Sequence, residues 1–203
     1  MYLNNYSFYE KLNTEALEFL EKSLMPVSLK KGNILFYQDD ICDNILFLTK
    51  GKVRLYIQSD DAEEITLYEL SAGEQCIVNT ASTISQTQAI GSAVTTSDIE
   101  GYLISAKNAK ILAKMSDDYQ SFLFSLYTLR MRDLAQLVND IKFKKLPERV
   151  LEWLNSKKIS KVQTTHETIA NELGSSRVAT SRVLKELEKS NKISLSRGYI
   201  EIL

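Results

Sequence analysis

The sequence predicts an α+β protein with an N-terminal antiparallel β-barrel of the jelly-roll type, one long helix and a small C-terminal helical domain. Three observations predict this order. Short runs of alternating apolar residues, separated by turn formers, fill residues 27–104. Residues 105–145 contain no Gly or Pro. The charge also changes sign, because residues 1–141 carry 12 Lys and Arg against 19 Asp and Glu, whereas residues 142–203 carry 13 against 7.

The composition excludes several classes of protein. The 203 residues are 44% hydrophobic and 25% charged, as in ordinary globular domains. No apolar run is long enough for a membrane span, and no apolar leader opens the chain, so a cytoplasmic protein without membrane contact is expected. Two cysteines are too few for a disulfide scaffold, and one histidine excludes a multi-histidine metal site.

The barrel domain is expected over residues 1–115. Its clearest strand signals are residues 53–57, 65–67 and 93–96, where apolar and polar residues alternate. Strands at this spacing, with turn formers between them, favour an antiparallel barrel. A short amphipathic helix is predicted in front of them, over residues 14–24.

A long dimerisation helix is predicted over residues 116–145, with Ser116 as its cap. Two apolar stripes run along it, which suggests two partners, the barrel and a second copy of the helix. A helix buried wholly within its own chain is the alternative. The residues expected at the dimer contact are Leu123, Leu126, Leu134, Leu137 and Ile141. Pro147 fits the first turn of a new helix and begins a third domain, residues 146–203.

This third domain has the pattern of a winged helix-turn-helix. Thr165 can cap a first helix, Gly174 can end it, and Ser175 or Ser176 can cap the second. A β-hairpin over residues 193–202 follows as the wing.

The second helix presents polar and cationic side chains, so the expected partner is double-stranded DNA. Arg177 and Arg182 can both face a groove. His166, in the first turn of the first helix, is expected to contact a phosphate or to lie on the plain surface rather than to ligate a metal. The residues expected to face DNA are Thr165, His166, Ser175, Ser176, Arg177, Val178, Thr180, Ser181, Arg182, Lys185 and Arg197.

Barrel, long helix and winged helix-turn-helix, in this order, resemble the Crp/Fnr family of bacterial transcription regulators. The segment Leu-Gly-Ser-Ser-Arg-Val-Ala-Thr-Ser-Arg is close to the recognition-helix motif of that family. Arg177 and Arg182 match its two arginines, and Ser176 and Ser181 match its small polar residues. Val178 replaces an acidic residue that accepts from cytosine, so the operator is expected to differ at that base pair. The resemblance implies a homodimer on a two-fold-symmetric operator and contact with RNA polymerase.

The resemblance extends to a cyclic-nucleotide-binding-like barrel, but the phosphate-binding cassette of that barrel is absent. Residues 45–55 and 70–74 look like the family's strand-turn-strand signature and the lead-in to its cassette. No arginine lies between Arg54 and Arg130, so a buried phosphate would lack a guanidinium partner. Cyclic AMP and cyclic GMP are therefore disfavoured. The expected effector pocket comprises Cys76, Ile77, Val78, Asn79 and Leu134.

Other effectors of the family are judged by their ligands. An iron–sulfur cluster is disfavoured because residues 1–41 contain no cysteine. Haem stays open, with Cys42, Cys76 and His166 among its candidate axial ligands. Each cysteine is a candidate for redox sensing or for a small core residue. Residues 79–92 are rich in neutral polar groups and favour a mostly uncharged effector.

We therefore expect a non-enzymatic regulator under the control of an effector or redox signal other than a cyclic nucleotide. One alternative is a constitutive regulator whose barrel is a degenerate protein-interaction module. A remote alternative is a cupin-like enzyme, disfavoured because the barrel segment has no histidine for a metal.

Overall fold

The computed structural model describes residues 3–59 and 63–203, except for the side chains of residues 141–143. The chain divides into two compact units. The barrel unit comprises residues 1–57 and 67–133, and the C-terminal unit comprises residues 134–203 together with the short stretch 58–66.

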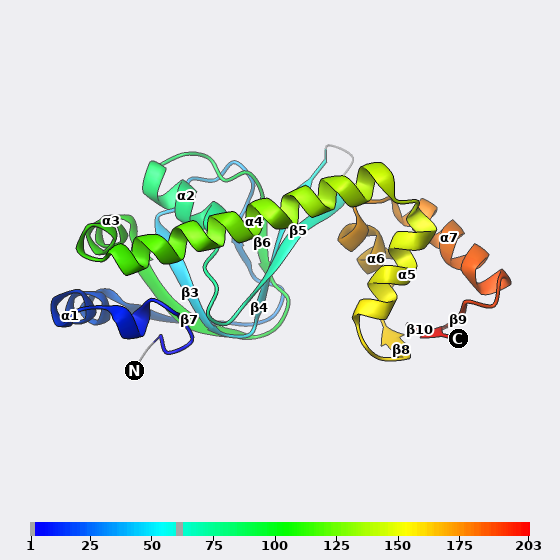
Figure 1. The fold of residues 1–203 in the computed structure, drawn as a ribbon, viewed down its shortest axis with the longest axis horizontal. Helices are drawn as coiled ribbons and strands as arrows, with labels where there is room; N and C mark the ends of the chain where they lie inside the picture. Colours follow the sequence, from blue (N-terminus) through cyan, green and yellow to red (C-terminus); the bar gives the residue numbers. More distant parts are fainter. Residues whose placement is uncertain (1–2, 60–62) are drawn as a thin grey trace. The chain divides into compact units, whose positions relative to one another are not determined.

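Two antiparallel sheets form the barrel unit, as the sequence predicts (Figure 1). The first has the order β1-β7-β3, and the second has the order β2-β6-β4-β5. The strands are β1 (Met25–Leu29), β2 (Ile34–Phe36), β3 (Asn44–Lys50), β4 (Lys52–Gln58), β5 (Glu64–Ser71), β6 (Ser92–Thr95) and β7 (Ile99–Ser105). Pairing of β3 with β7 places Leu46 directly opposite Leu103.

Helices pack on the barrel, and the last of the short ones is followed in the chain by the long helix α4. They are the 3-10 turn η1 (Tyr9–Lys11), α1 (Thr14–Ser23), α2 (Ile77–Ser85), α3 (Ala106–Met115) and α4 (Asp117–Phe143). The Ser116 hydroxyl accepts from the Tyr119 amide at 3.1 Å, which confirms the predicted cap of α4. Helices α2 and α3 were not predicted. No helix within the described ranges is long and apolar enough to cross a bilayer.

An aromatic cluster fixes the first half of α4 on the barrel. Phe8 lies 4.8 Å from Tyr119 and 5.0 Å from Phe122 between ring centroids, and Phe47 of β3 joins the same group. Because side chains alternate along a strand, β3 turns Phe47 toward this cluster and Leu48 into a second core inside the barrel. Both side chains are almost fully buried.

The C-terminal unit combines three helices with a small sheet of order β8-β10-β9. Its elements are α5 (Leu146–Ser156), β8 (Lys161–Gln163), α6 (His166–Leu173), α7 (Arg177–Lys189), β9 (Ile193–Ser196) and β10 (Tyr199–Ile202). Pro147 lies in the first turn of α5, as predicted. The hairpin β9–β10 is the predicted wing, and β8 adds a third strand that the sequence pattern did not reveal.

Gly51 makes the turn between β3 and β4 possible. Its φ of +86° is in the left-handed region, and a Cβ atom there would lie 2.2 Å from the carbonyl oxygen of Asp98. Gly32 has almost the same φ, +87°, but open space where its Cβ would be. A substitution at Gly32 therefore introduces backbone strain alone, whereas the same substitution at Gly51 adds a steric clash.

We expect Gly51→Ala to destabilise the protein more than Gly32→Ala does. Gly32→Ala should lower the free energy of unfolding by about 1–2 kcal/mol, the cost of a left-handed residue with a Cβ. Gly51→Ala should cost at least about 1 kcal/mol more, because a backbone oxygen must also move. Urea unfolding followed by circular dichroism measures both values, and equal losses would contradict the close approach at Gly51.

Candidate nucleic-acid interface and barrel cavity

Local capping interactions set the geometry of the helix-turn-helix. The Thr165 hydroxyl accepts from the Thr168 amide at 3.0 Å and begins α6. Gly174, with φ 55° and ψ 52°, ends α6 in the left-handed conformation. The Ser176 hydroxyl then accepts from the Ala179 amide at 3.2 Å and begins α7. These three predicted signals are confirmed, and Ser176 rather than Ser175 is the cap.

A buried arginine stabilises the C-terminal end of α6, just before the turn at Gly174. Arg149 of α5 is 7% exposed, and its Nη2 donates to the carbonyl oxygen of Leu173, the last residue of α6. Burial lowers the pKa of this guanidinium. This role of Arg149 was not predicted, although the residue lies in the predicted helix that begins at Leu146.

The outer face of α7 carries five of the eleven side chains that were expected to face DNA. Arg177, Val178, Arg182 and Lys185 are exposed, and together with Ser181 they line one shallow hollow. Val178 is 71% exposed and is the apolar member of this surface. The helix therefore presents a cationic surface with one apolar position in it.

Thr180 does not belong to this surface, and its predicted DNA contact is wrong. Its side chain is fully buried. Positions three and four residues apart share one face of a helix, so Thr180 lies on the same stripe as the buried Val183, Leu184 and Leu187.

The remaining expected DNA contacts surround α7. His166 Nδ1 lies 2.9 Å from the Ser181 hydroxyl, which joins α6 to α7. Arg197 is exposed in the wing turn, next to Gly198 with φ +78°. An acidic neighbour was missed, since Glu167 Oε2 lies 3.5 Å from Arg177 Nε with both side chains exposed.

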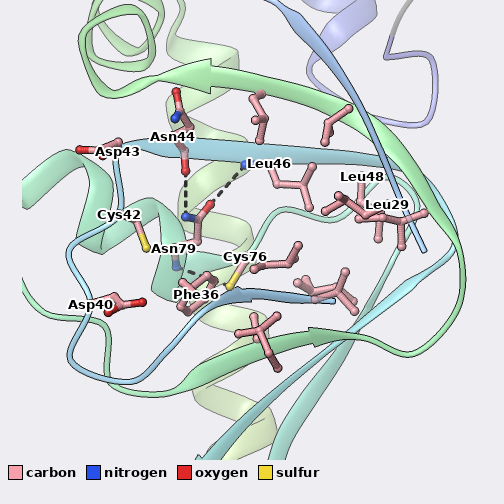
Figure 2. Close-up of a pocket in the computed structure, with 18 of the residues that line it drawn as sticks. Leu29, Phe36, Asp40, Cys42, Asp43, Asn44, Leu46, Leu48, Cys76 and Asn79 are labelled. Carbon is pink, nitrogen blue, oxygen red and sulfur yellow. Dashed lines mark hydrogen bonds between the residues drawn. The ribbon is translucent and has the colours of Figure 1, made fainter. Parts of the chain in front are cut away.

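The barrel unit encloses a cavity of about 420 Å³ (Figure 2). Cys42, Cys76 and Asn79 line it, so the structure brings together two of the five predicted pocket residues with the second cysteine. Burial raises the pKa of the Cys76 thiol, which keeps it protonated and makes it a poor nucleophile.

Two of the predicted pocket residues lie elsewhere. Ile77 and Val78 belong to α2 and pack in the hydrophobic cores rather than on the cavity wall. They turn away from the cavity because residues 77–85 form helix α2, which was not predicted. Leu134 belongs to the C-terminal unit, so its place at the pocket stays a prediction.

A buried ion pair joins the segment beside the cavity to α4. Arg130 is 4% exposed, and its guanidinium donates to Glu74 at 2.8 Å and to Asp133 at 2.9 Å. The same group lies 4.3 Å from the ring centroid of Tyr68, whose hydroxyl is 3.6 Å from the Cys76 sulfur. Arg130 therefore places a positive charge beside Glu74, near the position where the family's phosphate-binding cassette would be, but two carboxylates already balance this charge.

The cavity does not fit a haem. The described lining residues include no lysine, arginine or histidine, so haem propionates would meet only the carboxylates Asp40, Asp43 and Glu74. The buried Cys76 thiol is held protonated, whereas a haem thiolate must be ionised. In the part of the chain that the structure describes, no group of three or more metal-ligating side chains occurs.

The expected dimer residues divide between two faces of α4. Leu126 is 6% exposed within the core of the barrel unit, so assigning it to a dimer contact was wrong. Leu123 is half-buried against the same core, and its dimer contact stays a prediction. Leu134 and Leu137 are half-buried, and the Ile141 side chain lies outside the described residues. The exposed face carries Phe124, Met131 and Val138 instead, at 70%, 67% and 66% exposure.

Comparisons with known proteins agree with this geometry. Residues 26–115 match the family model of the cyclic nucleotide-binding domain, and residues 148–203 match the Crp-like helix-turn-helix domain. A cyclic AMP receptor protein from Thermus thermophilus is 26% identical over 191 residues, which cover 92% of this chain and 86% of that protein.

Solved structures show the same arrangement of elements. A c-di-GMP-responsive global regulator from Xanthomonas campestris shares the fold at 16% identity, with a TM-score of 0.82 over 94% of this chain and 99% of the other. A Crp/Fnr-family transcriptional regulator from Eubacterium rectale is 30% identical, with a TM-score of 0.86 over 98% of this chain and 94% of the other. This chain therefore belongs to the Crp/Fnr family of transcription regulators and carries the helix-turn-helix DNA-binding domain of that family.

Proposed function

We propose that this regulator is a cytoplasmic homodimer that binds a two-fold-symmetric operator, contacts RNA polymerase and responds to a signal other than a cyclic nucleotide. The single observation that carries the proposal is the outer face of α7, where Arg177 and Arg182 are both exposed directly after the capped turn. Two exposed arginines on a rigid helix suit bidentate contacts to guanine in the major groove. The same proposal assigns residues 1–115 to sensing, 116–145 to dimerisation and 146–203 to DNA binding.

The surrounding residues would position α7 on the duplex. Arg197 in the wing and Lys185 on α7 would contact phosphates, together with the hydroxyls of Thr165 and Ser175. Ser176 caps α7, so its backbone and hydroxyl stay close to the DNA surface. Val178 would offer an apolar contact to a thymine methyl group.

A second copy of the chain would cover the exposed apolar face of α4. Phe124, Met131 and Val138 recur every seven residues, and Tyr127 and Leu134 follow the first two of them by three. This is the a and d spacing of a two-stranded coiled coil. A lone helix in water would leave these large side chains exposed, whereas pairing removes them from solvent.

The charges around the barrel cavity argue against cyclic-nucleotide control. A cyclic phosphate is an anion and needs a cationic partner once it is buried. Every charged residue among the described cavity-lining positions is a carboxylate: Asp40, Asp43 or Glu74. Arg130 is bound to two carboxylates, so it would have to break an existing ion pair to bind a phosphate.

We expect the Arg177→Ala/Arg182→Ala double variant to bind DNA at least about 30-fold more weakly, because each arginine contact to a base contributes about 1–3 kcal/mol. Duplexes selected from a random library by the purified wild-type protein serve as the probe, and fluorescence anisotropy measures affinity. The control, Lys107→Ala/Lys110→Ala, removes the same charge from exposed positions of α3. Equal effects of the two double variants would contradict the assignment of α7.

Val178→Glu should change which sequences are selected, since a carboxylate accepts from the amino group of cytosine and valine cannot. We expect the selected half-sites to differ at one base pair, with a new C·G preference. Sequencing of the duplexes selected by both proteins checks this, and identical motifs would show that residue 178 does not face a base.

Met131→Glu should convert the dimer to a monomer, because two carboxylates would be buried opposite each other in an apolar contact. Size-exclusion chromatography with light scattering measures the mass. Asn139→Glu adds the same charge at an exposed position outside the seven-residue repeat and should leave the dimer intact. If Met131→Glu stays dimeric, the contact lies on another surface.

A further inference from the structure

We infer that the barrel cavity binds a small, uncharged and predominantly apolar molecule. The inference rests on the proposed function only in making that molecule the signal that controls DNA binding. The preference for an uncharged apolar ligand follows from the cavity wall, and it is stated for the described residues.

Aliphatic and aromatic side chains from several strands form most of the wall. The cavity volume of about 420 Å³ is within the usual range of small-molecule sites. An apolar cavity of on the order of 150 Å³ already stays dry and takes up benzene. The apolar lining residues are Val27, Leu29, Ile34, Leu35, Phe36, Ile41, Leu46, Leu48, Val53, Leu70, Ala93, Ile99 and Leu103.

Two buried polar side chains on the wall, those of Asn79 and Cys76, already have partners within the protein. The side-chain amide of Asn79 donates through Nδ2 to the Asn44 carbonyl oxygen at 2.9 Å, and its Oδ1 accepts from the backbone N–H of Leu46 at 3.2 Å (Figure 2). The Cys76 sulfur lies 3.6 Å from the Tyr68 hydroxyl oxygen and accepts from the backbone N–H of Asn79. Since these two buried side chains are already hydrogen-bonded and most of the wall is apolar, the affinity for a ligand must come mainly from burial of apolar surface.

The charged groups add a preference against anions. Glu74 is paired with Arg130, and Asp40 accepts from the Tyr37 amide at 2.7 Å. Asp40 and Asp43 are exposed, so the negative charge lies where a ligand enters from solvent. An anionic ligand would meet this field without a cationic partner among the described lining residues, whereas an uncharged ligand would not be opposed by it.

The wall also has an accessible part through which a ligand can enter. Ile34 and Ile41 are 37% and 52% exposed, and the paired Leu46 and Leu103 are half-buried. Large apolar side chains that line a cavity and still contact solvent gain free energy when a ligand covers them. The cavity is therefore open enough to exchange a ligand without unfolding of the barrel.

A matched pair of fluorescent probes tests the ligand class. N-phenyl-1-naphthylamine is uncharged, and 8-anilino-1-naphthalenesulfonate is the same ring system with a sulfonate. We expect the uncharged probe to bind with one site per chain, and the anionic probe to bind at least about tenfold more weakly, a difference of about 1.4 kcal/mol. Equal binding of both, or no saturable binding of the uncharged probe, would overturn the inference.

Variants locate the bound probe. Ala93→Phe fills the cavity and should weaken binding of the uncharged probe at least about tenfold. Val94→Phe is the matched control, because Val94 is the next residue of β6 and points to the other face of the sheet, opposite Arg54. If both variants weaken binding equally, the probe binds elsewhere.

Leu103→Gln covers the case in which Ala93→Phe does not fold. It keeps the volume of a half-buried side chain but makes the wall polar, and it should weaken probe binding about threefold or more. Circular dichroism checks that each variant is folded. Unchanged probe binding by a folded Leu103→Gln variant would contradict an apolar site in this cavity.

DNA affinity, measured separately on the same preparations, distinguishes the two levels of the proposal. A protein that binds selected duplexes but shows no preference for the uncharged probe retains the proposed function and overturns the inference. A protein that binds the uncharged probe in the cavity but binds no DNA retains the inference and overturns the proposed function.

Discussion

Helix α4 carries apolar side chains on two faces, and one of these faces packs against the barrel. The burial of this face fixes how the helix lies on the barrel unit. Tyr119 and Phe122 are buried against Phe8 in the aromatic cluster, so this face is committed to the barrel. Phe124 and Met131, on the other face, remain exposed in the single chain. If a second copy covers the exposed face, as proposed, sensing and assembly would share one element.

The short segment from Glu74 to Thr80 connects that helix to the cavity. Glu74 lines the cavity and binds Arg130 of α4, while the neighbouring Gln75 amide lies 3.3 Å from the Tyr119 hydroxyl. Cys76 lines the cavity and begins α2. A ligand that moves this segment would therefore shift the contacts of α4 directly, which is a physical route from occupancy of the cavity to α4.

How much the sequence predicted depended on whether the signal was local. The helix-turn-helix was predicted correctly because Thr165, Gly174 and Ser176 act on their own backbone neighbourhood. The cavity was predicted only in part, because the unpredicted helix α2 turns Ile77 and Val78 into the hydrophobic cores. Two apolar stripes on α4 were recognised, but only the packed structure shows which stripe the barrel takes.

The cationic segment of residues 142–203 is proposed to hold duplex DNA through its phosphates while α7 reads the bases. The salt dependence of affinity tests it most directly, because a protein that neutralises phosphates releases counterions as it binds. In fluorescence anisotropy with library-selected duplexes, the account predicts that the logarithm of the association constant falls linearly as the logarithm of the salt concentration rises. No association at low ionic strength, or an affinity that does not change with salt, would contradict the account.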